Sequence, residues 1–481
     1  MPTITLDQAG FRGLGPDFYS EVTATPLPQP RLAAYNASLA AELGLPAHAG
    51  DWPDAAAMLA GNLPAADSAA MATVYSGHQF GVWAGQLGDG RALLLGEAGG
   101  QEVQLKGAGL TPYSRMGDGR AVLRSSIREY LCSEAMHGLG IPTTRALALV
   151  ASPETVWRET PETAAVVTRV APSFLRFGHF EHFFYRDQQP QLSQLVDYAV
   201  RRYFPHCSEA ARPAQAMLEE VIRRTAALIA DWQAVGFCHG VMNSDNMSLL
   251  GLTIDYGPFG FLDGFDAGHI CNHSDHSGRY AYGAQPEIGL WNLHCLAQAL
   301  LPLLDRDEAI AALKQYQPLF ETELTHRFSR KLGLATQEDD DWSLLVRLFD
   351  LMQASRSDWT LFWRQLSRFD SSPDALNPAV RDMVLDREAF DGWAQDYKTR
   401  LAREASVDAA RHTAMLATNP KYVLRNHLAE QAIRQAQAGD DSEITRLQQL
   451  LAQPFDEQPA FEAYASLPPD WAKQLSVSCS S

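Results

Sequence analysis

Lys106 is the first lysine of this chain and Lys314 the second, although arginines occur throughout the sequence around Lys106. Lys106 ends the alternating stretch Val103-Gln104-Leu105-Lys106, which predicts a β-strand. A lysine supplies a compact point charge with rotatable donors, whereas an arginine supplies a flat fork. Either the fold needs a point charge at this strand position, as a phosphate site would, or the lone lysine is chance in an arginine-rich composition. The motifs around it decide between the two.

Composition limits the classes of function. With 481 residues the chain exceeds one ordinary domain, and its formal net charge of −18 argues against broad binding to nucleic acid or an anionic membrane. The six cysteines include no C-x-x-C pair, so neither a disulfide scaffold nor a zinc site is expected. The N-terminus lacks the basic and apolar regions of a signal peptide, and no apolar run reaches the roughly 18–20 residues of a membrane span. We therefore expect a cytoplasmic protein without nucleic-acid or membrane partners.

The distribution of strand-like and helix-like segments predicts two lobes. Strand patterns dominate from Tyr75 to Val170, interrupted by a predicted helix at Arg120–His137, and helical periodicity prevails after Pro172, as at Pro213–Val235. A small strand-rich lobe before a larger helical lobe is the protein-kinase arrangement, so the expected fold class is α+β, kinase-like and bilobal. The expected divisions are an N-terminal extension at 1–70 with a short helical stretch near Arg31–Leu43, an N-lobe at 71–172, a C-lobe at 173–385, and a C-terminal helical region with a cysteine-containing tail at 386–481.

Two Gly-Asp-Gly-Arg strings flank the lone lysine, at Gly88-Asp89-Gly90-Arg91 and Gly117-Asp118-Gly119-Arg120. Glycines let backbone N–H groups approach phosphate oxygens because no Cβ is in the way. Both strings are also ordinary turn sequences, but their positions on either side of Lys106 favour the phosphate interpretation. Glu129, on the predicted helix, is the residue type that holds a strand lysine toward phosphate in a kinase, although helix glutamates are more often simply solvated.

The longest motif is His239-Gly240-Val241-Met242-Asn243-Ser244-Asp245-Asn246, followed by Ile254-Asp255-Tyr256-Gly257. It is typical of a kinase catalytic loop, His-x-Asp-x-x-x-x-Asn, and of the Asp-Phe-Gly segment that follows such a loop. Asn246 and Asp255 are then the two oxygen ligands of a metal such as Mg²⁺.

The motif departs from the kinase pattern at one position. Val241 stands where a kinase has its catalytic aspartate, and a valine can neither accept a hydroxyl proton nor orient a nucleophile. Asp245 is the nearest carboxylate. It is either a substitute base or a loop residue that caps and orients its neighbours, and the chemistry alone gives the two interpretations equal weight.

With these motifs in view, the sequence resembles the selenoprotein O (SelO) family, which includes bacterial proteins. The similarity covers nearly the whole chain. The resemblance implies a kinase-like fold that binds ATP in reversed orientation and transfers AMP, rather than the γ-phosphoryl group, to hydroxyl side chains of proteins. A reoriented nucleotide also accounts for Val241, since a different phosphorus meets the nucleophile. The strings that carry the resemblance are Tyr75–Gly81, Gln104–Gly109, Met116–Arg120, His239–Asn246, Asp255–Pro258, Asn272–Asp275 and Asn419–Tyr422.

The same resemblance implies roles for individual residues. Asp245 is the catalytic proton acceptor, Asn246 and Asp255 hold Mg²⁺ or Mn²⁺, and Glu129 is the structural partner of Lys106. Without the resemblance, Arg169 and Arg176 would be taken as arginines of surface salt bridges. The residues implied around ATP are Gly88, Gly90, Arg91, Lys106, Asp118, Gly119, Arg169, Arg176 and Asp255.

A cysteine near the C-terminus suggests how the site could be regulated. Eukaryotic members of the family carry selenocysteine near the C-terminus, and Cys479 occupies the matching place. A reversible Cys271–Cys479 disulfide that gates the site is one hypothesis, and two free thiols are the other.

The rival functions are a conventional phosphotransferase with Asp245 as base and a non-catalytic pseudokinase scaffold that binds nucleotide. Mg²⁺ and Mn²⁺, and ATP and UTP, are left as alternatives.

Overall fold

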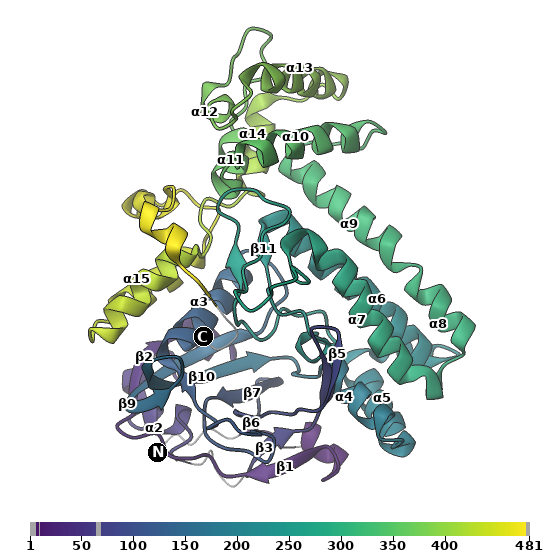
Figure 1. Ribbon diagram of the computed structural model, residues 1–481, viewed down its shortest axis with the longest axis vertical. Helices are drawn as coiled ribbons and strands as arrows, with labels where there is room; N and C mark the ends of the chain where they lie inside the picture. The colour runs from purple at the N-terminus through teal and green to yellow at the C-terminus, as the bar shows by residue number, and fades with distance from the viewer. Residues whose placement is uncertain (1–5, 9, 64–68, 478–481) are drawn as a thin grey trace.

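The computed structural model describes residues 6–8, 10–63 and 69–477. Strands fill the N-terminal part of the chain and helices the C-terminal part, and the two regions lie against each other (Figure 1). This confirms the predicted α+β class and the predicted order of a strand-rich region before a helical region.

The strand-rich region is built on an eight-stranded sheet with antiparallel pairing. Across the sheet the strands are β1 (Tyr19–Val22), β3 (Ala70–Thr73), β6 (Ala92–Ala98), β7 (Gln101–Lys106), β10 (Pro161–Ala171), β9 (Arg145–Trp157) and β2 (Arg31–Tyr35), with β8 (Ala121–Val122) paired to β10. Between β7 and β10, Lys106 lies opposite Val167 and Gln104 opposite Arg169. Lys106 and Arg169 are therefore diagonal neighbours on one face of the sheet, which brings two cations together.

One predicted helix is wrong in part. The stretch Arg31–Leu43 begins as strand β2, and helix α1 (Ala37–Glu42) follows it. Asn36 separates the two elements, because its Oδ1 accepts from the Leu39 N–H at 3.1 Å and caps the helix. Its Nδ2 also donates to the Ala146 carbonyl at 3.2 Å and fixes the cap to the sheet. The first five residues form a strand because β9 offers them backbone partners, which helical periodicity along the sequence does not reveal.

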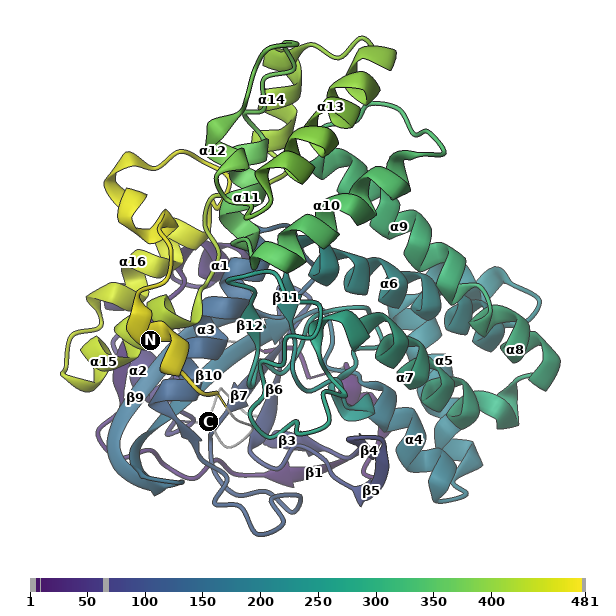
Figure 2. The same cartoon turned by 45° about the horizontal axis from the view of Figure 1, so that its top comes forward.

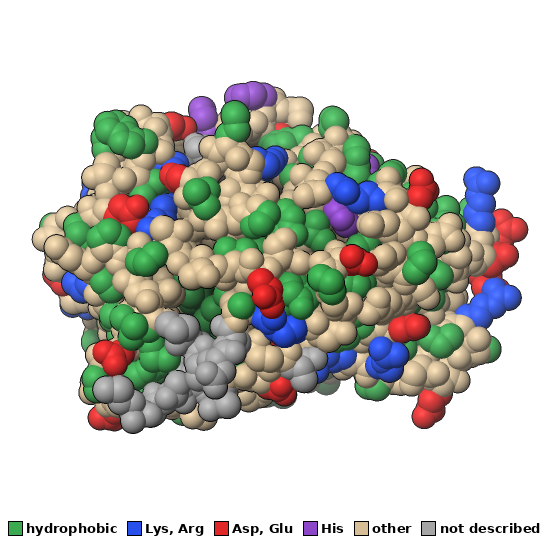
Figure 3. Space-filling view, turned by 90° about the horizontal axis from the view of Figure 1, so that it is seen from below, with side chains coloured by type: hydrophobic (Ala, Val, Ile, Leu, Met, Phe, Trp, Pro, Cys, Tyr) green, Lys and Arg blue, Asp and Glu red, His purple; other side chains and the backbone are tan. Residues whose placement is uncertain are grey.

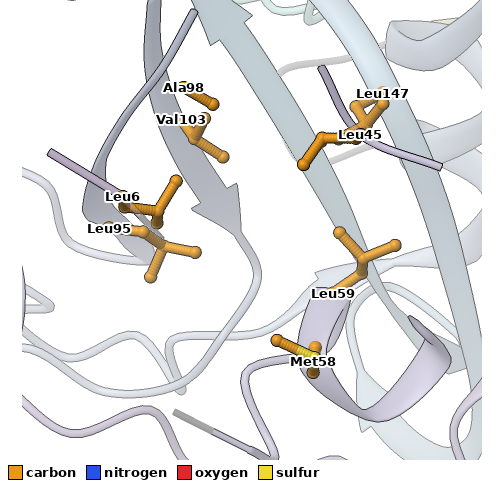
Figure 4. Close-up of a pocket in the computed structure, with 8 residues that line it drawn as sticks. All are labelled: Leu6, Leu45, Met58, Leu59, Leu95, Ala98, Val103 and Leu147. Carbon is orange, nitrogen blue, oxygen red and sulfur yellow. The ribbon is translucent and has the colours of Figure 1, made fainter. Parts of the chain in front are cut away.

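Both faces of the sheet are buried. In β6, Leu93 joins the core beneath the N-terminal segment, while Leu94 joins the core shared with helix α3 (Leu123–Gly138). This two-sided burial explains the continuous apolar run Ala92–Leu95, since alternation is needed only where one face meets water. A cavity of about 20 Å³ lies between the sheet, the N-terminal segment and helix α2 (Ala55–Leu59), and its apolar walls offer a water molecule no partner (Figure 4). The lining residues are Leu6, Leu45, Met58, Leu59, Leu95, Ala98, Val103 and Leu147.

Helix α6 (Pro213–Val235) coincides with the predicted helix at both ends. Pro213 occupies the first turn, where its missing N–H costs nothing, and Gly236 ends the helix in the left-handed conformation at φ 78°. The helix packs against α7, α8 and α9, beside which it lies on the right of Figure 1. The helices of this part are α4 (Phe177–Tyr185), α5 (Gln189–Tyr203), α7 (Gln285–Leu300), α8 (Arg306–Leu313) and α9 (Tyr316–Lys331).

A second helical core stands at the top of Figure 1 and is rich in aromatic side chains. The chain then returns to the strand-rich region, where α15 and α16 pack on α3 (Figure 2). There the Tyr130 hydroxyl donates to Gln448 Oε1 at 3.0 Å, so α3 is enclosed between the sheet and the C-terminal helices. The elements concerned are α10 (Asp341–Ser355), α11 (Trp359–Leu366), α12 (Pro378–Arg381), α13 (Arg387–Arg403), α14 (Asp408–Leu416), α15 (Asn426–Gln437) and α16 (Ser442–Leu451).

The surface seen from below Figure 1 mixes apolar, acidic and basic side chains (Figure 3). Charges of both signs are interspersed on this face. Among the described residues, no helix has both the length and the hydropathy that a bilayer span requires.

Replacing Gly236 by alanine should destabilise the protein. The new Cβ would lie 2.6 Å from Trp359 Cδ1, and φ 78° is a conformation that alanine avoids. We expect a loss of about 2–4 kcal/mol in the free energy of unfolding, measured by urea denaturation. Gly392 is the matched control, because it lies inside α13 with open space at its Cβ position, so Gly392→Ala should gain roughly 0.5–1 kcal/mol. Equal effects of the two substitutions would contradict this geometry.

Candidate active site

The residues singled out from the sequence converge on one cleft whose walls come from both regions. Its volume is about 580 Å³, which is in the range of small-molecule sites. Seven Lys and Arg residues line it against four Asp residues, so the cleft is electropositive in a chain of net charge −18. The expected residues that line it are Gly88, Gly90, Arg91, Lys106, Asp118, Gly119, Arg169, Arg176, Asp245, Asn246 and Asp255.

Lys106 ends strand β7 and points its Nζ at two carboxylates. Nζ donates to Glu129 Oε2 at 2.5 Å and lies 3.9 Å from Asp255 Oδ1. Glu129 comes from α3, so the pairing of a strand lysine with a helix glutamate, expected from the sequence, is present. Burial lowers the pKa of Lys106, and the Glu129 carboxylate opposes that shift.

Two buried arginines meet Asp255 from the strand-rich side. Arg169 Nη1 donates to Asp255 Oδ1 at 2.6 Å and to Glu129 Oε1 at 3.2 Å. Arg176 Nη1 donates to the other oxygen of Asp255 and, at 2.8 Å, to the carbonyl of Asp245. The arginine side chains are only 4% and 2% exposed, so they are not surface arginines. Burial alone would raise the pKa of Asp255, but Arg176 and Arg169 outweigh burial and hold that pKa well below its usual range.

Arg91 lines the same cleft with unused donors. Within residues 6–8, 10–63 and 69–477 its guanidinium has no hydrogen-bond or ion-pair partner. Burial lowers the pKa of Arg91, and the nearby carboxylates of Glu129 and Asp255 oppose that shift. A half-buried guanidinium without a partner carries a desolvation cost, which an anion bound in the cleft would offset.

The first glycine string is shaped by a tyrosine that packs on it. A Cβ on Gly88 would lie 2.6 Å from Tyr113 Cγ, and a Cβ on Gly90 would lie 2.9 Å from the Tyr113 carbonyl oxygen. Gly88 also has φ 106°, which other residues rarely adopt. The close approach of Tyr113 therefore requires both glycines, whatever else the loop binds.

The second glycine string is held by an arginine that sequence reasoning missed. Arg158 Nη1 donates to Asp118 Oδ2 at 2.7 Å and Arg158 Nη2 donates to Asp118 Oδ1 at 3.0 Å. These bonds lower the pKa of Asp118. Gly119 has φ 73°, and a Cβ there would lie 2.2 Å from the carbonyl carbon of Gly109. Arg158 is 40 positions from Asp118 in the chain and belongs to no motif, so no local signal marks it.

The loop after α6 is fixed to Asp255 by a histidine. The loop begins after β11 (Phe237–Cys238), which pairs with β12 (Gly260–Phe261). His239 is buried, burial lowers its pKa, and its neutral ring donates from Nε2 to the Ile254 carbonyl at 2.9 Å. Asp255, the next residue, has φ 57°, a left-handed conformation that aspartate tolerates better than most residues. The carboxylate is thus oriented by backbone geometry as well as by ion pairs.

Asn246 and Val241 lie at the two ends of one hydrogen bond. Asn246 Nδ2 donates to the Val241 carbonyl at 3.0 Å, and both residues line the cleft. With its nitrogen engaged, Asn246 keeps its side-chain oxygen as an acceptor or metal ligand. Val241 is buried, so the position that a kinase gives to its catalytic aspartate supplies only an apolar wall.

Asp245 is a buried carboxylate with one unused oxygen. Its Oδ2 accepts from Gln79 Nε2 at 3.3 Å, whereas its Oδ1 has no hydrogen-bond partner in the part of the chain that the structure describes. Burial raises the pKa of Asp245 to about 7, and the Gln79 hydrogen bond opposes the shift. A buried carboxylate of this kind, in a cleft, is suited to accept a proton near neutral pH, which favours the base over the capping interpretation.

The hairpin that covers Asp245 was missed by motif reasoning. Strands β4 (Ser76–Gln79) and β5 (Val82–Gln86) pair with each other and lie against the loop. The His78 N–H donates to Ser244 Oγ at 2.8 Å. Gly77 is required because its Cβ position lies 2.9 Å from Asp245. The sequence signal for this hairpin was its place in the family resemblance, since nothing in its spacing points to the loop.

Cys479 lies outside the described residues, so the Cys271–Cys479 disulfide stays a prediction. Val477, two residues before Cys479, accepts a hydrogen bond from the N–H of His273, two residues after Cys271, at 2.8 Å. Cys271 Sγ lies 2.6 Å from the Cβ position of Gly240, at the start of the loop. Burial raises the pKa of Cys271 well above its usual range, so its protonated form dominates at neutral pH.

A sequence profile of the family described as "Protein adenylyltransferase SelO" matches residues 4–453. The chain belongs to the SelO family. It is accordingly an enzyme of the protein nucleotidyltransferase class. The SelO match spans both the strand-rich region and the helical region.

Relatives named "Protein nucleotidyltransferase YdiU" are similar over almost their full length. The protein of Cupriavidus pinatubonensis is 57% identical over 491 residues, covering 98% of this chain and 94% of the relative. That of Paraburkholderia xenovorans is 57% identical over 496 residues, covering 99% and 96%. That of Variovorax paradoxus is 58% identical over 482 residues, covering 98% and 96%.

Removing the carboxylate of Asp255 should destabilise the protein. Asp255→Ala leaves the buried Arg169 and Arg176 without their shared partner, so we expect a loss of about 3 kcal/mol in the free energy of unfolding, measured by urea denaturation. Asp382→Ala is the control, because its ion pair with Arg387 at 3.0 Å joins side chains that are more than half exposed, and its loss should cost less than about 1 kcal/mol. Similar costs for the two variants would contradict the central role of Asp255.

Proposed function

We propose that this SelO-family protein has a kinase-like, two-lobed fold and transfers AMP from ATP to hydroxyl groups of Ser, Thr or Tyr on target proteins, releasing pyrophosphate. The observation that carries the proposal is the arrangement of charge in the cleft. Two of its buried polar groups are the cations Arg169 and Arg176, and beside them stands a buried carboxylate, Asp245, one oxygen of which has no hydrogen-bond partner among the described residues.

The position of the buried cations supports a reversed nucleotide. An adenine ring offers no anion to offset the desolvation of Arg169 and Arg176, whereas the β- and γ-phosphates do. The terminal phosphates therefore belong at the buried end of the cleft, near Lys106, and the adenosine belongs toward its mouth. In this orientation the α-phosphorus, and not the γ-phosphorus, faces the incoming hydroxyl.

The donor set fits a divalent metal such as Mg²⁺ or Mn²⁺. Asn246 keeps its side-chain oxygen free because its nitrogen is bonded to the Val241 carbonyl, and Asp255 stays ionised because of its low pKa. Two oxygen ligands, completed by phosphate oxygens, are the usual protein share of such a site. When bound, the metal supplies positive charge to the phosphates. Asp255 can bind a metal only if Arg169 and Arg176 turn from its carboxylate to the phosphates. The phosphates then replace Asp255 as the anions that pair with the two arginines.

Asp245 is the proposed base. It accepts the proton of the target hydroxyl while the hydroxyl oxygen forms a bond to the α-phosphorus and the bond to the β-phosphate oxygen breaks. The negative charge that develops on pyrophosphate is stabilised by Lys106, Arg91 and the buried arginines, which favour the transition state over the ground state. In this scheme the position of Val241 needs no catalytic side chain, because the nucleophile approaches the α-phosphorus and not the γ-phosphorus.

The two rival functions use the same cleft differently. A conventional phosphotransferase would use Asp245 to direct a hydroxyl to the γ-phosphorus. A pseudokinase scaffold would bind nucleotide without chemistry, and then a free carboxylate oxygen buried beside the phosphate site would serve nothing. Family membership and the unused oxygen of Asp245 favour the transferase.

The position of the label in ATP separates these functions. With Mg²⁺ or Mn²⁺, we expect transfer of radioactivity from α-labelled ATP to protein, no transfer from γ-labelled ATP, and release of pyrophosphate. Asp255→Ala should abolish the transfer. Labelling from γ-labelled ATP would replace the proposal with the phosphotransferase, and labelling from neither would replace it with the scaffold. UTP labelled at the α-phosphate, run in parallel, decides nucleotide preference.

Replacing Asp245 by asparagine should remove the base and keep the shape. We expect kcat to fall by roughly 100-fold or more, with a smaller change in KM for ATP. The ionised form is the active one, so the wild-type rate should rise with pH along a limb near or below the value of about 7 to which burial raises the pKa of Asp245. A bound metal moves this limb to lower pH. Asp118→Asn is the control and should keep the limb, and an unchanged limb in Asp245→Asn would refute the assignment.

A further inference from the structure

A second cluster of metal-ligating side chains lies behind the catalytic loop. Among the residues that the structure describes, His78, Glu181 and Cys295 form the one group of three His, Cys, Asp or Glu residues whose ligand atoms all lie within 4.8 Å of one another. His78 Nδ1 and Glu181 Oε2 are 2.6 Å apart. None of the three lines the nucleotide cleft, so the cluster belongs to a different place in the molecule.

The cluster joins three elements that are distant in sequence. His78 comes from β4 of the hairpin, Glu181 from α4 and Cys295 from α7. The Glu181 side chain is completely buried, and its Oε1 has no hydrogen-bond partner among the described residues. A buried carboxylate oxygen without a partner is costly. It marks a place where a further positive group or a metal would be stabilised.

Aromatic rings surround the cluster. The ring centroids of Trp83, Trp291 and Tyr185 lie 5.1, 5.4 and 6.0 Å from that of His78. Trp83 and Tyr185 are exposed, but the His78 side chain beneath them is only 14% exposed and that of Glu181 is completely buried. The lower local dielectric of a largely buried site strengthens interactions between charged ligands and a cation. Arg279 stacks on Trp291 at 4.6 Å, its Nε and Nη2 have no hydrogen-bond partner among the described residues, and its charge acts on Cys295. It is therefore the cation near the cluster that competes with a metal.

We propose that His78, Glu181 and Cys295 form a zinc site, separate from the nucleotide cleft, that fastens the β4–β5 hairpin to the helical region. The donor set of imidazole nitrogen, carboxylate oxygen and thiolate sulfur is one that Zn²⁺ accepts and that Mg²⁺ and Ca²⁺ do not prefer. The ionised Glu181 and Cys295 supply two negative charges, which match the charge of the ion. A water molecule or another donor completes the four-coordinate shell.

Metal binding changes the positions of protons on Cys295 and His78. Cys295 releases its thiol proton to solvent when its sulfur binds the metal, and His78 binds through Nδ1, which leaves its ring proton on Nε2. The Nδ1–Oε2 separation then widens from 2.6 Å to about 3.3 Å, the spacing of two tetrahedral ligands. Without a metal, burial and then the Glu181 charge raise the pKa of Cys295 to about 12, so the thiol stays protonated.

The site would act on the catalytic loop through the hairpin. The His78 N–H bonds to Ser244 Oγ, and the next residue, Gln79, bonds to Asp245. A metal that holds the His78 side chain therefore fixes the backbone from which Gln79 reaches Asp245. His78 is in this sense a positioning residue, which touches neither nucleotide nor metal in the cleft.

Metal content tests the site directly. The full-length wild-type protein, stripped with a chelator and then incubated with ZnCl₂, should retain one zinc per chain after desalting, as measured by elemental mass spectrometry. Cys295→Ser and His78→Gln should retain none, with their fold checked by circular dichroism. Cys207→Ala is the matched control, since Cys207 is a buried cysteine outside the cluster, and it should retain the zinc. CoCl₂ in place of zinc should give a thiolate-to-cobalt absorption band in the wild type that Cys295→Ser lacks.

Competition with magnesium and comparison of the variants decide whether the zinc site exists. Excess MgCl₂ should leave the zinc in place, because the hard cation does not compete for a thiolate. If the wild type retains no more zinc than Cys295→Ser, or if Cys207→Ala loses it equally, the site does not exist. The readout requires no nucleotide, so it is independent of whether the protein transfers AMP.

Discussion

The carboxylate of Asp255 is the interaction on which the rest of the site depends. It is supplied by the helical region, and Arg169, Arg176 and Lys106 approach it from the strand-rich region and the turn after it. Without this anion Arg176 would be buried with only a carbonyl partner, and Arg169 would keep only the carboxylate of Glu129, which it shares with Lys106, at a cost of several kcal/mol. The pair therefore holds the two regions together at the cleft. Under the proposed function, this carboxylate would bind a metal only after the phosphates of a nucleotide take its place as the partner of the arginines.

Rigid elements on both sides of the cleft fix Asp255 and the cations that meet it. The His239 hydrogen bond fixes the backbone just before it, and the left-handed φ of 57° turns the carboxylate toward the cleft. On the opposite side, the pairing of β7 with β10 fixes the spacing of Lys106 and Arg169. Because these groups cannot move far, a bound ligand is expected to change which charged groups pair with each other. It is expected to change their positions much less. Preorganised charge of this kind is what electrostatic catalysis needs.

Sequence reasoning succeeded where chemistry is encoded locally and failed where partners are distant. The ends of α6 were readable because Pro213 and Gly236 mark them, and the cleft residues were readable because the motifs resemble a known family. The strand at the start of Arg31–Leu43 was misread because its partner, β9, lies more than a hundred residues away. Distance along the chain is also the reason that the contact of Arg158 with Asp118, and those of His78 with Glu181 and Cys295, could not be predicted. The glycines of the first string were predicted for phosphate, whereas Tyr113 also requires them, a contact that no local pattern encodes.

The β4–β5 hairpin has a consequence for the acidity of Asp245. Asp245 has a raised pKa because it is buried, and part of that burial comes from β4, which lies against it at Gly77. If the hairpin moved away, water would reach the carboxylate and its pKa would fall toward the ordinary value for aspartate. A weaker base would result, because a carboxylate of low pKa gains little from accepting a proton. Whatever fixes the hairpin therefore helps to keep this carboxylate buried and its pKa raised, which gives a structural role to side chains of the hairpin such as His78.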